Sequence, residues 1–330
     1  MHRRHTRYAR MSTALALIDD RRLGELVRGA RPGSAGIGGR SGVLDVDGTP
    51  VFVKRVPLTA RELRPSNLRS TVDLFDLPSF YQYGIGSTGF GAWRELALHV
   101  MTTNWVLSQA HDGFPLTYHW RILPDSAPDG FLDEFGGLDG AVAHWEDSPA
   151  VRVRLTELAA AEHSLALFLE YVPETVAERF SARPDEDTYR WAVREVERTA
   201  AFLREQGVVH FDGHFGNLLA DGDRLLFADF GLALSARFRL GAAETGFLGR
   251  HLPSYDLCRT LSHLRRHHLP AEAPTDAVHA LLAPYAPALD LFDGFVERLL
   301  GESRRTPYPA DEIERLLPAP ELPIRVSTEG

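Results

Sequence analysis

The sequence predicts an α+β protein that is long enough for two lobes. Two short β runs, 43–46 and 50–54, are joined by Asp47-Gly48 and form a hairpin pattern in the first part of the chain. A long amphipathic pattern over 185–206 indicates a helix in the second part. The length of 330 residues suits two lobes or domains with a large buried core.

Composition is that of an ordinary globular protein, with 44% hydrophobic and 25% charged residues. The net charge of -9 gives no support for nucleic acid as a partner. No apolar run approaches the length of a membrane span, and the apolar stretch 14–18 is too short for a signal peptide. We therefore expect a cytoplasmic protein with no membrane partner.

The single cysteine, Cys258, excludes an intramolecular disulfide and is expected to be a buried structural thiol.

Lys54 is the only lysine in the sequence; every other Lys/Arg position is arginine. It ends the second β run, Pro50 to Lys54. A chain this biased towards arginine keeps lysine where a compact, flexible ammonium cannot be replaced by a planar guanidinium. The pattern therefore marks Lys54 as a functional residue.

The remaining elements of the first half follow in order. Residues 1–30 are expected to be an N-terminal extension, loose over 1–11, followed by a helix from Ser12 to Ala30. A glycine-rich turn occupies 31–42. The stretch 57–91 reads as an insertion rich in Pro, Gly and aromatic residues, either a substrate lid or a packed loop.

Between this insertion and the long amphipathic helix, the sequence predicts four further segments. They are a helix over 92–100, a strand over 117–123, a second irregular insertion over 124–147 and a helix over 151–163. An apolar strand follows over 165–173. Beyond 254 a helix begins, residues 270–320 read as short helices broken by prolines, and the tail after Pro318 is expected to be extended.

Two neighbouring stretches carry the chemistry. The first is Val208-Val209-His210-Phe211-Asp212-Gly213-His214-Phe215-Gly216-Asn217, and the second is Phe227-Ala228-Asp229-Phe230-Gly231. The hairpin turn Asp221-Gly222-Asp223 lies between them and would deliver both to one place. Asp212 can take a proton from a hydroxyl, and the side-chain oxygens of Asn217 and Asp229 suit a hard divalent cation.

These motifs resemble those of the protein-kinase-like superfamily, whose catalytic loop carries an Asp base and an Asn, followed by Asp-Phe-Gly. The His-x-Asp-x-His-x-x-Asn form is similar to the aminoglycoside and choline phosphotransferase branch of atypical bacterial kinases. The resemblance implies a two-lobed fold, with a small antiparallel β lobe over 31–172 and a larger, mainly helical lobe over 173–330. The two insertions, 57–91 and 124–147, belong to the small lobe.

The resemblance also implies roles for individual residues. Asp212 would be the catalytic base, and Asn217 and Asp229 would hold Mg²⁺. Lys54 would bind ATP phosphates, held by a glutamate for which Glu95 is preferred over Glu62. The remaining ATP-binding groups are the glycine turn and the backbone of the strand that resembles the hinge, namely Gly36, Gly38, Gly39, Glu170 and Val172.

Three neighbours of the motif have open roles. Asp256 matches the family's buried aspartate that braces the catalytic loop, although a carboxylate at a helix N-terminus would also be expected there. His210 is expected to pack beneath Asp-Phe-Gly. His214 either orients Asp212 or the metal-bound water, or has a packing role. Phe211 stands where many protein kinases have an arginine that reads a phosphorylated loop, and the segment after Gly231 is short and lacks Ala-Pro-Glu.

The sequence therefore predicts a phosphotransferase that uses ATP and Mg²⁺ and acts on a hydroxyl of a small molecule or biosynthetic peptide. An atypical Ser/Thr protein kinase and a nucleotide-binding pseudokinase scaffold are the alternatives. A metal hydrolase using His210, Asp212 and His214 would leave Lys54 and Asp-Phe-Gly without a role. The acceptor and the oligomeric state stay open.

Overall fold

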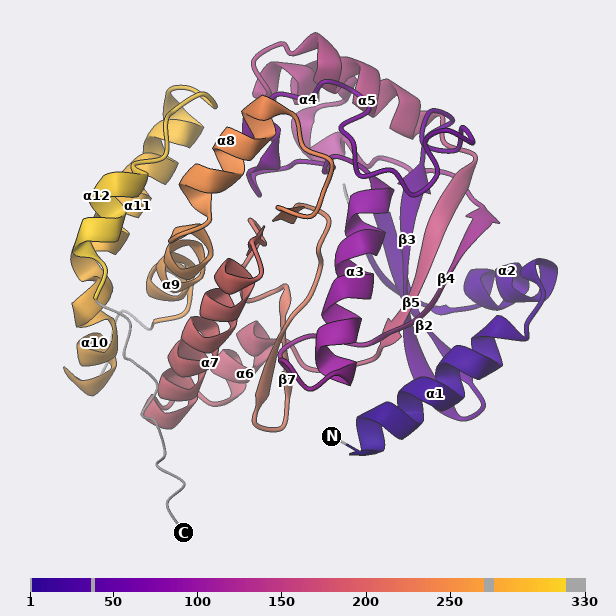
Figure 1. Cartoon of the computed structure of the whole chain (residues 1–330), viewed down its shortest axis with the longest axis horizontal. Helices are drawn as coiled ribbons and strands as arrows, with labels where there is room; N and C mark the ends of the chain where they lie inside the picture. The colour runs from indigo at the N-terminus through magenta and orange to yellow at the C-terminus, as the bar shows by residue number, and fades with distance from the viewer. Residues whose placement is uncertain (1, 37–38, 270–275, 319–330) are drawn as a thin grey trace.

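The computed structural model describes residues 2–36, 39–269 and 276–318. Within them the protein is an α+β structure with a five-stranded antiparallel sheet of order β1-β2-β3-β5-β4. The strands are β1 (Arg31–Gly36), β2 (Gly39–Val46), β3 (Thr49–Leu58), β4 (Thr117–Pro124) and β5 (His163–Glu170). Figure 1 shows this sheet on one side of the molecule and the helices of the C-terminal half on the other.

The predicted hairpin is confirmed, and both of its strands are longer than the predicted runs. Asp47 and Gly48 have φ of 50° and 74°, the left-handed backbone that a two-residue hairpin turn between twisted strands requires. The turn pairs Val46 with Thr49. This register places Lys54 in the middle of the sheet, between Ser41 of β2 and Leu167 of β5.

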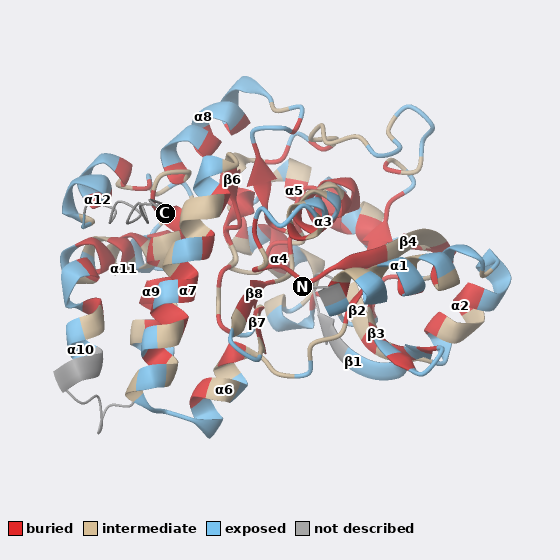
Figure 2. Cartoon of the chain, turned by 60° about the horizontal axis from the view of Figure 1, so that its bottom comes forward, coloured by how far each residue is buried: buried red, intermediate tan, exposed pale blue. Residues whose placement is uncertain are grey.

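Helices cover both faces of the sheet. Side chains alternate along a strand, so Val51 and Val53 of β3 face one way and Val56 faces the other. The first face packs against α1 (His2–Ala16) and α2 (Asp20–Arg28), and the second against α3 (Ala92–Leu107). Lys54 has the parity of Val56, so its side chain points towards α3. Figure 2 shows the outward surfaces of α1 and α2 exposed.

The prediction for the N-terminus was wrong. Residues 1–11 were expected to be loose, but α1 begins at His2, and Arg4 is only 4% exposed. The single helix expected from Ser12 to Ala30 is instead two helices. Asp19 breaks it, because its side chain accepts a hydrogen bond from Arg22 N and caps α2.

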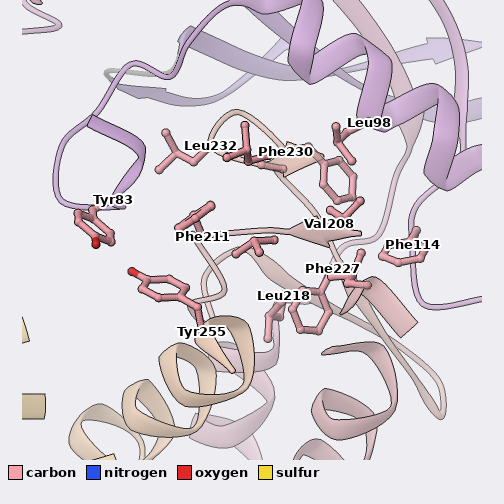
Figure 3. Packing of buried hydrophobic residues seen from close by; sticks show 14 of the residues in the cluster. Tyr83, Leu98, Phe114, Val208, Phe211, Leu218, Phe227, Phe230, Leu232 and Tyr255 are labelled. Carbon is pink, nitrogen blue, oxygen red and sulfur yellow. The ribbon is translucent and has the colours of Figure 1, made fainter. Parts of the chain in front are cut away.

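The first insertion is a packed segment. β3 extends to Leu58, and the rest of the segment up to α3 contains one 3₁₀ turn, Ser79–Gln82. Its aromatic side chains are all buried: Phe75, Phe80, Tyr81, Tyr83 and Phe90. Tyr83 reaches the helical half, where it packs against Phe211 and Tyr255 (Figure 3).

The second insertion is more regular than predicted. Residues 124–147 contain a 3₁₀ turn, Asp133–Phe135, and the helix α4 (Leu138–His144). The helix expected over 151–163 is α5 (Pro149–Ala159), whose N-cap is Ser148. It ends early because His163 already pairs with Leu58 in the sheet.

The C-terminal half is mainly helical. The long amphipathic helix is confirmed as α7 (Glu186–Glu205), with Asp185 as its N-cap. The other helices there are α6 (Val176–Ala182), α8 (Ala242–His251), α9 (Tyr255–His267), α10 (Asp276–Leu282), α11 (Ala286–Gly301) and α12 (Ala310–Leu316). The expectation of only short helices after residue 270 was wrong for α11, whose Pro287 lies in its first turn, where proline is tolerated. The tail beyond Pro318 lies outside the described residues.

Cys258 is fully buried in α9, as expected of a structural thiol, and burial raises its pKa to about 12. In the part of the chain that the structure describes, no helix has both the length and the apolar character needed to cross a membrane.

Candidate active site

Asp212, Asn217 and Asp229 come together through one strand-loop-hairpin unit. β6 (Val208–Val209) leads into the loop 210–217, and the hairpin of β7 (Leu218–Asp221) and β8 (Arg224–Phe227) returns the chain to Ala228. Ala228 N donates a hydrogen bond of 3.1 Å to Asn217 O. The two segments are therefore tied together directly beside Asp229.

Buried contacts fix the loop that carries Asp212. Asp256 of α9 accepts hydrogen bonds from His210 N at 2.7 Å and from Phe211 N at 3.0 Å. Burial raises the pKa of Asp256, while these two donors act in the opposite direction. Phe211 has a φ of 66°, an uncommon conformation for a bulky residue, and it is fully buried (Figure 3).

His210 is buried beneath Phe230. Its ring centroid lies 5.3 Å from that of Phe230, and its Nε2 lies 3.0 Å from Ala228 O. Its Nδ1 accepts a hydrogen bond from Asp212 N at 3.3 Å. Both ring nitrogens thus face the backbone. The metal-hydrolase alternative would need His210, Asp212 and His214 on one side of an extended stretch. They do not alternate in this way, because the positive φ of Phe211 turns the chain. Among the described residues, no group of three or more His, Cys, Asp or Glu side chains is placed to hold a metal ion.

Lys54 forms two ion pairs in the interior. Its Nζ lies 2.8 Å from Glu95 Oε1 and 2.7 Å from Asp229 Oδ1. Burial would lower the pKa of Lys54, but the charges of Asp229 and Glu95 raise it above its ordinary value. Burial would raise the pKa of Asp229, yet Lys54 and Gly231 N lower it to about 2. Lys54 and Asp229 are therefore both charged at neutral pH.

The structure distinguishes the two glutamates considered for Lys54. Glu95 lies on α3 and pairs with Lys54, since that face of β3 points at α3. Glu62 forms a buried pair of 2.9 Å with Arg154, and its Oε1 accepts a hydrogen bond from Ala92 N, at the start of α3. Glu62 therefore holds α3 in place and does not contact Lys54.

Asp212 is oriented by Asn217. Asn217 Nδ2 donates to Asp212 Oδ2 at 2.9 Å, and 20% of the Asp212 side chain is exposed. His214 Nε2 lies 3.9 Å from the same carboxylate oxygen. Burial lowers the pKa of His214, while the charge of Asp212 raises it. Asp212 thus combines a fixed orientation with access to solvent, as a proton acceptor requires.

A cavity of about 670 Å³ opens beside these groups. Its lining comes from the sheet, from the chain after β5 and from the loop: it includes Phe52, Lys54, Leu169, Tyr171, Val172, Asn217 and Asp229. A volume of this size fits a drug-sized ligand. Apolar and charged side chains both line the cavity, which suits a molecule with a flat apolar part and an anionic part.

The predicted glycines and strand residues lie around this cavity in different ways. Gly39 lines it, and Gly36 pairs with Gly39 where β1 ends and β2 begins. Gly38 lies outside the described residues. Glu170 also lines the cavity, but its N–H donates to Leu116 O. Val172 has no backbone hydrogen bond to another described residue, so its N–H and C=O can serve a ligand.

Sequence reasoning missed the buried ion pair that ties α1 to the end of β5. Arg4 Nε lies 3.1 Å from both carboxylate oxygens of Glu170, and Arg4 Nη2 lies 2.5 Å from Oε2. Arg4 also donates to the carbonyl oxygens of Asp112 and Phe114. The basic N-terminus gave no periodic signal that could have indicated this role.

Sequence reasoning also missed the path of the first insertion, which lies against the catalytic loop. A β-carbon on Gly84 would lie 2.3 Å from Asp212 Oδ1, and one on Gly89 would lie 2.3 Å from Gly231 O. Gln82 Nε2 donates to Leu232 O. The segment 82–89 therefore forms a wall beside Asp212 and Asp-Phe-Gly.

Comparison of the sequence with protein-family models found no matching family. A search of curated proteins found no significant match.

Proposed function

We propose that this protein is a phosphotransferase that moves the γ-phosphate of ATP to a hydroxyl, with Mg²⁺ as the metal and Asp212 as the base. In this proposal the fold is the two-lobed protein-kinase-like fold, with a small lobe over 31–172 and a larger lobe over 173–330. The observation that supports it most strongly is the meeting of Lys54, Glu95 and Asp229 at one end of the cavity, directly beside the Asp212–Asn217 pair. These residues come from four separate segments.

The oxygen donors left in the site fit a magnesium ion. Asn217 donates from Nδ2, so its Oδ1 has no hydrogen bond to another described residue. Asp229 accepts through Oδ1 from Lys54 and Gly231 N, which leaves Oδ2 without a partner in the described part of the chain. Carboxylate and amide oxygens are the ligands Mg²⁺ prefers. An ion held by Asn217 and Asp229 would supply positive charge to the phosphates.

The chain's own residues would position the reactants. The Lys54 ammonium would bind phosphate oxygens, and Glu95 would keep it in place as Asp229 turned to the metal. Asp212 would accept the proton of the acceptor hydroxyl as the hydroxyl oxygen bonds to the γ-phosphorus. The bond from that phosphorus to the bridging oxygen breaks, and ADP leaves with the electron pair. Orientation and charge stabilisation are the main contributions in such a transfer.

The surroundings of Asp212 favour a compact acceptor, which is a small molecule or biosynthetic peptide. The wall 82–89 lies against Asp212, and between Gly231 and α9 the chain forms only β9 (Leu234–Ser235), a short link and α8. Little surface remains there for a folded protein substrate. The atypical Ser/Thr protein kinase is therefore the second candidate.

Asp212→Asn tests the proposal. We expect this variant to lose ADP formation while it binds Mg-ATP with an unchanged dissociation constant, because Asn keeps the shape but cannot accept the proton. Isothermal titration gives the binding constant, and a coupled ADP assay gives turnover. Wild-type protein that binds Mg-ATP but never turns over with any acceptor would contradict the proposal and indicate a pseudokinase scaffold.

A further inference from the structure

Helix α9 runs along the loop that carries Asp212. Asp256 holds the N–H groups of His210 and Phe211, and one turn later Thr260 approaches Gly213. A β-carbon on Gly213 would lie 2.5 Å from Thr260 Oγ1. Positions 256 and 260 are four residues apart and so lie on one face of the helix. This face is in contact with the loop.

The neighbouring face of α9 presents Tyr255, Arg259 and His263, again at intervals of four residues. The ring of Tyr255 lies 4.9 Å from that of Phe211, and the ring of His263 lies 5.7 Å from that of His214. Phe211 and His214 lie on either side of Asp212 in the sequence. Arg259 is therefore held beside the part of the loop that carries Asp212.

Arg259 has no hydrogen bond or ion pair with any residue in the described ranges, although it is partly buried. Arg265, further along the same helix, contrasts with it, because Arg265 pairs with Asp290 and Asp293. A partly buried guanidinium without a carboxylate partner is suited to bind a negatively charged ligand.

The positive charge of Arg259 acts on two neighbouring imidazoles, those of His214 and His263. Burial, and then the charge of Arg259, lower the pKa of His263 to about 3, and the same two causes lower the pKa of His214. His263 Nδ1 is buried without a hydrogen-bond partner among the described residues. An anion at this position would offset the charge of Arg259 and give the imidazoles an acceptor.

The face of α9 that carries Arg259 and His263, here called the basic face, is distinct from the nucleotide cavity of the proposed function. Arg259 and His263 do not contribute to the cavity lining, whereas Asn217 does. Asp212 contacts both regions, since its Oδ2 accepts a hydrogen bond from Asn217, which lines the cavity, and lies 3.9 Å from Nε2 of His214, which packs against His263.

We propose that Arg259, together with His214 and His263, binds a phosphate or carboxylate group of the acceptor and so places the acceptor hydroxyl at Asp212. This inference rests on the proposed function and deepens it: the acceptor is a small hydroxylated acid or phosphate ester. The wall 82–89 closes one side of the space at Asp212, and the basic face of α9 recognises the anion.

Histidine NMR tests the subsite without catalysis. The ¹⁵N-labelled chain, with Mg²⁺ and a non-hydrolysable ATP analogue present to fill the cavity, is titrated with inorganic phosphate at several pH values. The imidazole signals of His214 and His263 are assigned with His→Gln variants. We expect a saturable shift of both signals and an upward shift of the pKa of His263 in phosphate. The same titration with acetate tests whether the subsite binds a carboxylate group.

Arg259→Gln should weaken this binding by roughly tenfold or more, since a charged hydrogen-bond donor is lost. Arg259→Lys keeps the charge and should retain part of the affinity. Arg152→Gln, the same change on α5, well away from α9 in Figure 1, should leave it unchanged. Thermal unfolding of each variant shows that the fold persists. No saturable shift in the wild type with either anion, or equal affinity in Arg259→Gln, would overturn the inference.

Transfer assays separate this inference from the proposed function. Glycerol, glycerate and glycerol 3-phosphate are matched acceptors that differ in the anionic group. Turnover that prefers the anionic compounds, with a higher KM in Arg259→Gln, supports both proposals. Turnover with glycerol at equal efficiency, unaffected by Arg259→Gln, would overturn the anion subsite and leave the phosphotransferase intact. Phosphate binding without any turnover would leave the subsite standing while the proposed function fails.

Discussion

Gly84 lies so close to Asp212 that the site has no room for a side chain between them. A β-carbon built on Gly84 would come within 2.3 Å of Asp212 Oδ1 and 3.4 Å of Phe211 O. The insertion that carries Gly84 belongs to the sheet-containing half of the chain, whereas Asp212 belongs to the helical half. The contact therefore makes the insertion part of the active site in the proposed function.

Gly84→Ala tests this contact. The added methyl group must displace the Asp212 carboxylate, and a displacement of about 1 Å at a reacting group can lower kcat on the order of 10²-fold. We expect the loss in kcat, measured by ADP release, with the dissociation constant for Mg-ATP unchanged. Gly246→Ala in α8 is the matched control, because nothing lies within 4 Å of its β-carbon. Full activity of Gly84→Ala would show that the wall does not constrain Asp212.

Substitution of the two glutamates near α3 should have different effects: a change at Glu95 should lower mainly activity, and a change at Glu62 should lower mainly stability. Glu95→Gln removes the carboxylate that pairs with Lys54 and leaves Asp229 as the ion-pair partner of Lys54. We therefore expect activity to fall by about 10- to 100-fold. The accompanying change in the free energy of unfolding should be the smaller effect. Steady-state kinetics and urea unfolding measure the two quantities on the same samples.

Glu62→Gln should have the opposite profile. It breaks a buried pair with Arg154, and both side chains are only 1% exposed. Leaving a buried guanidinium unpaired costs about 3–5 kcal/mol, so the midpoint of urea unfolding should fall clearly. Activity per folded molecule, measured below the unfolding transition, should change much less than in Glu95→Gln. A catalytic defect in Glu62→Gln equal to that in Glu95→Gln would contradict these assignments.

Arg4 is expected to stabilise the end of the strand that borders the cavity. Arg4→Ala leaves Glu170, whose side chain is 2% exposed, with a hydrogen bond from Leu116 N and the more distant Arg7 at 3.7 Å. We expect a loss of about 3 kcal/mol in unfolding free energy and a higher KM for ATP. Arg3→Ala is the control, since Arg3 is exposed. Equal stability of the two variants would show that the α1 contact contributes little.

His251 should make stability depend on pH. Burial lowers its pKa to about 3 from an ordinary value of 6.5, so the unfolded chain binds a proton between these values and the folded chain does not. The stability that the folded state gains by keeping His251 neutral is fully present above pH 6.5 and is lost progressively as the pH falls towards 3. The slope is roughly 1 kcal/mol per pH unit.

The measurement is urea unfolding at several pH values between 4 and 8. His251→Gln should flatten the decline below pH 6.5, although it is less stable at neutral pH because Tyr83 loses its hydrogen-bond partner. His267→Gln, on an exposed side chain, should keep the wild-type slope. An unchanged slope in His251→Gln would assign the pH dependence to other groups.

Local patterns predicted the elements around the motif well. The Asp47-Gly48 turn, the helix after Asp185 and the hairpin at Gly222 depend on turn and cap chemistry within a few residues, which a sequence shows directly. The pairing of Lys54 with Glu95 could also be anticipated, because Glu95 lies on a strongly apolar helix.

Contacts over long sequence separations could not be predicted. The pair Arg4–Glu170 spans 166 residues, and Gly84 reaches Asp212 through an irregular segment without periodicity. The N-terminal segment looked loose because it is basic, whereas Arg4 is buried because it pairs with Glu170 and donates to the carbonyl oxygens of Asp112 and Phe114. Tertiary pairing of charges overrides such local signals.

The most direct test of the central claim is transfer of labelled γ-phosphate from Mg-ATP in a cell extract, with metabolites and macromolecules separated by size. The proposed function predicts label in the metabolite fraction with the wild type and none with Asp212→Asn. Label that appears only in macromolecules would favour the protein kinase alternative. Label that is equal for both proteins, or absent although Mg-ATP binds, would contradict catalysis by Asp212.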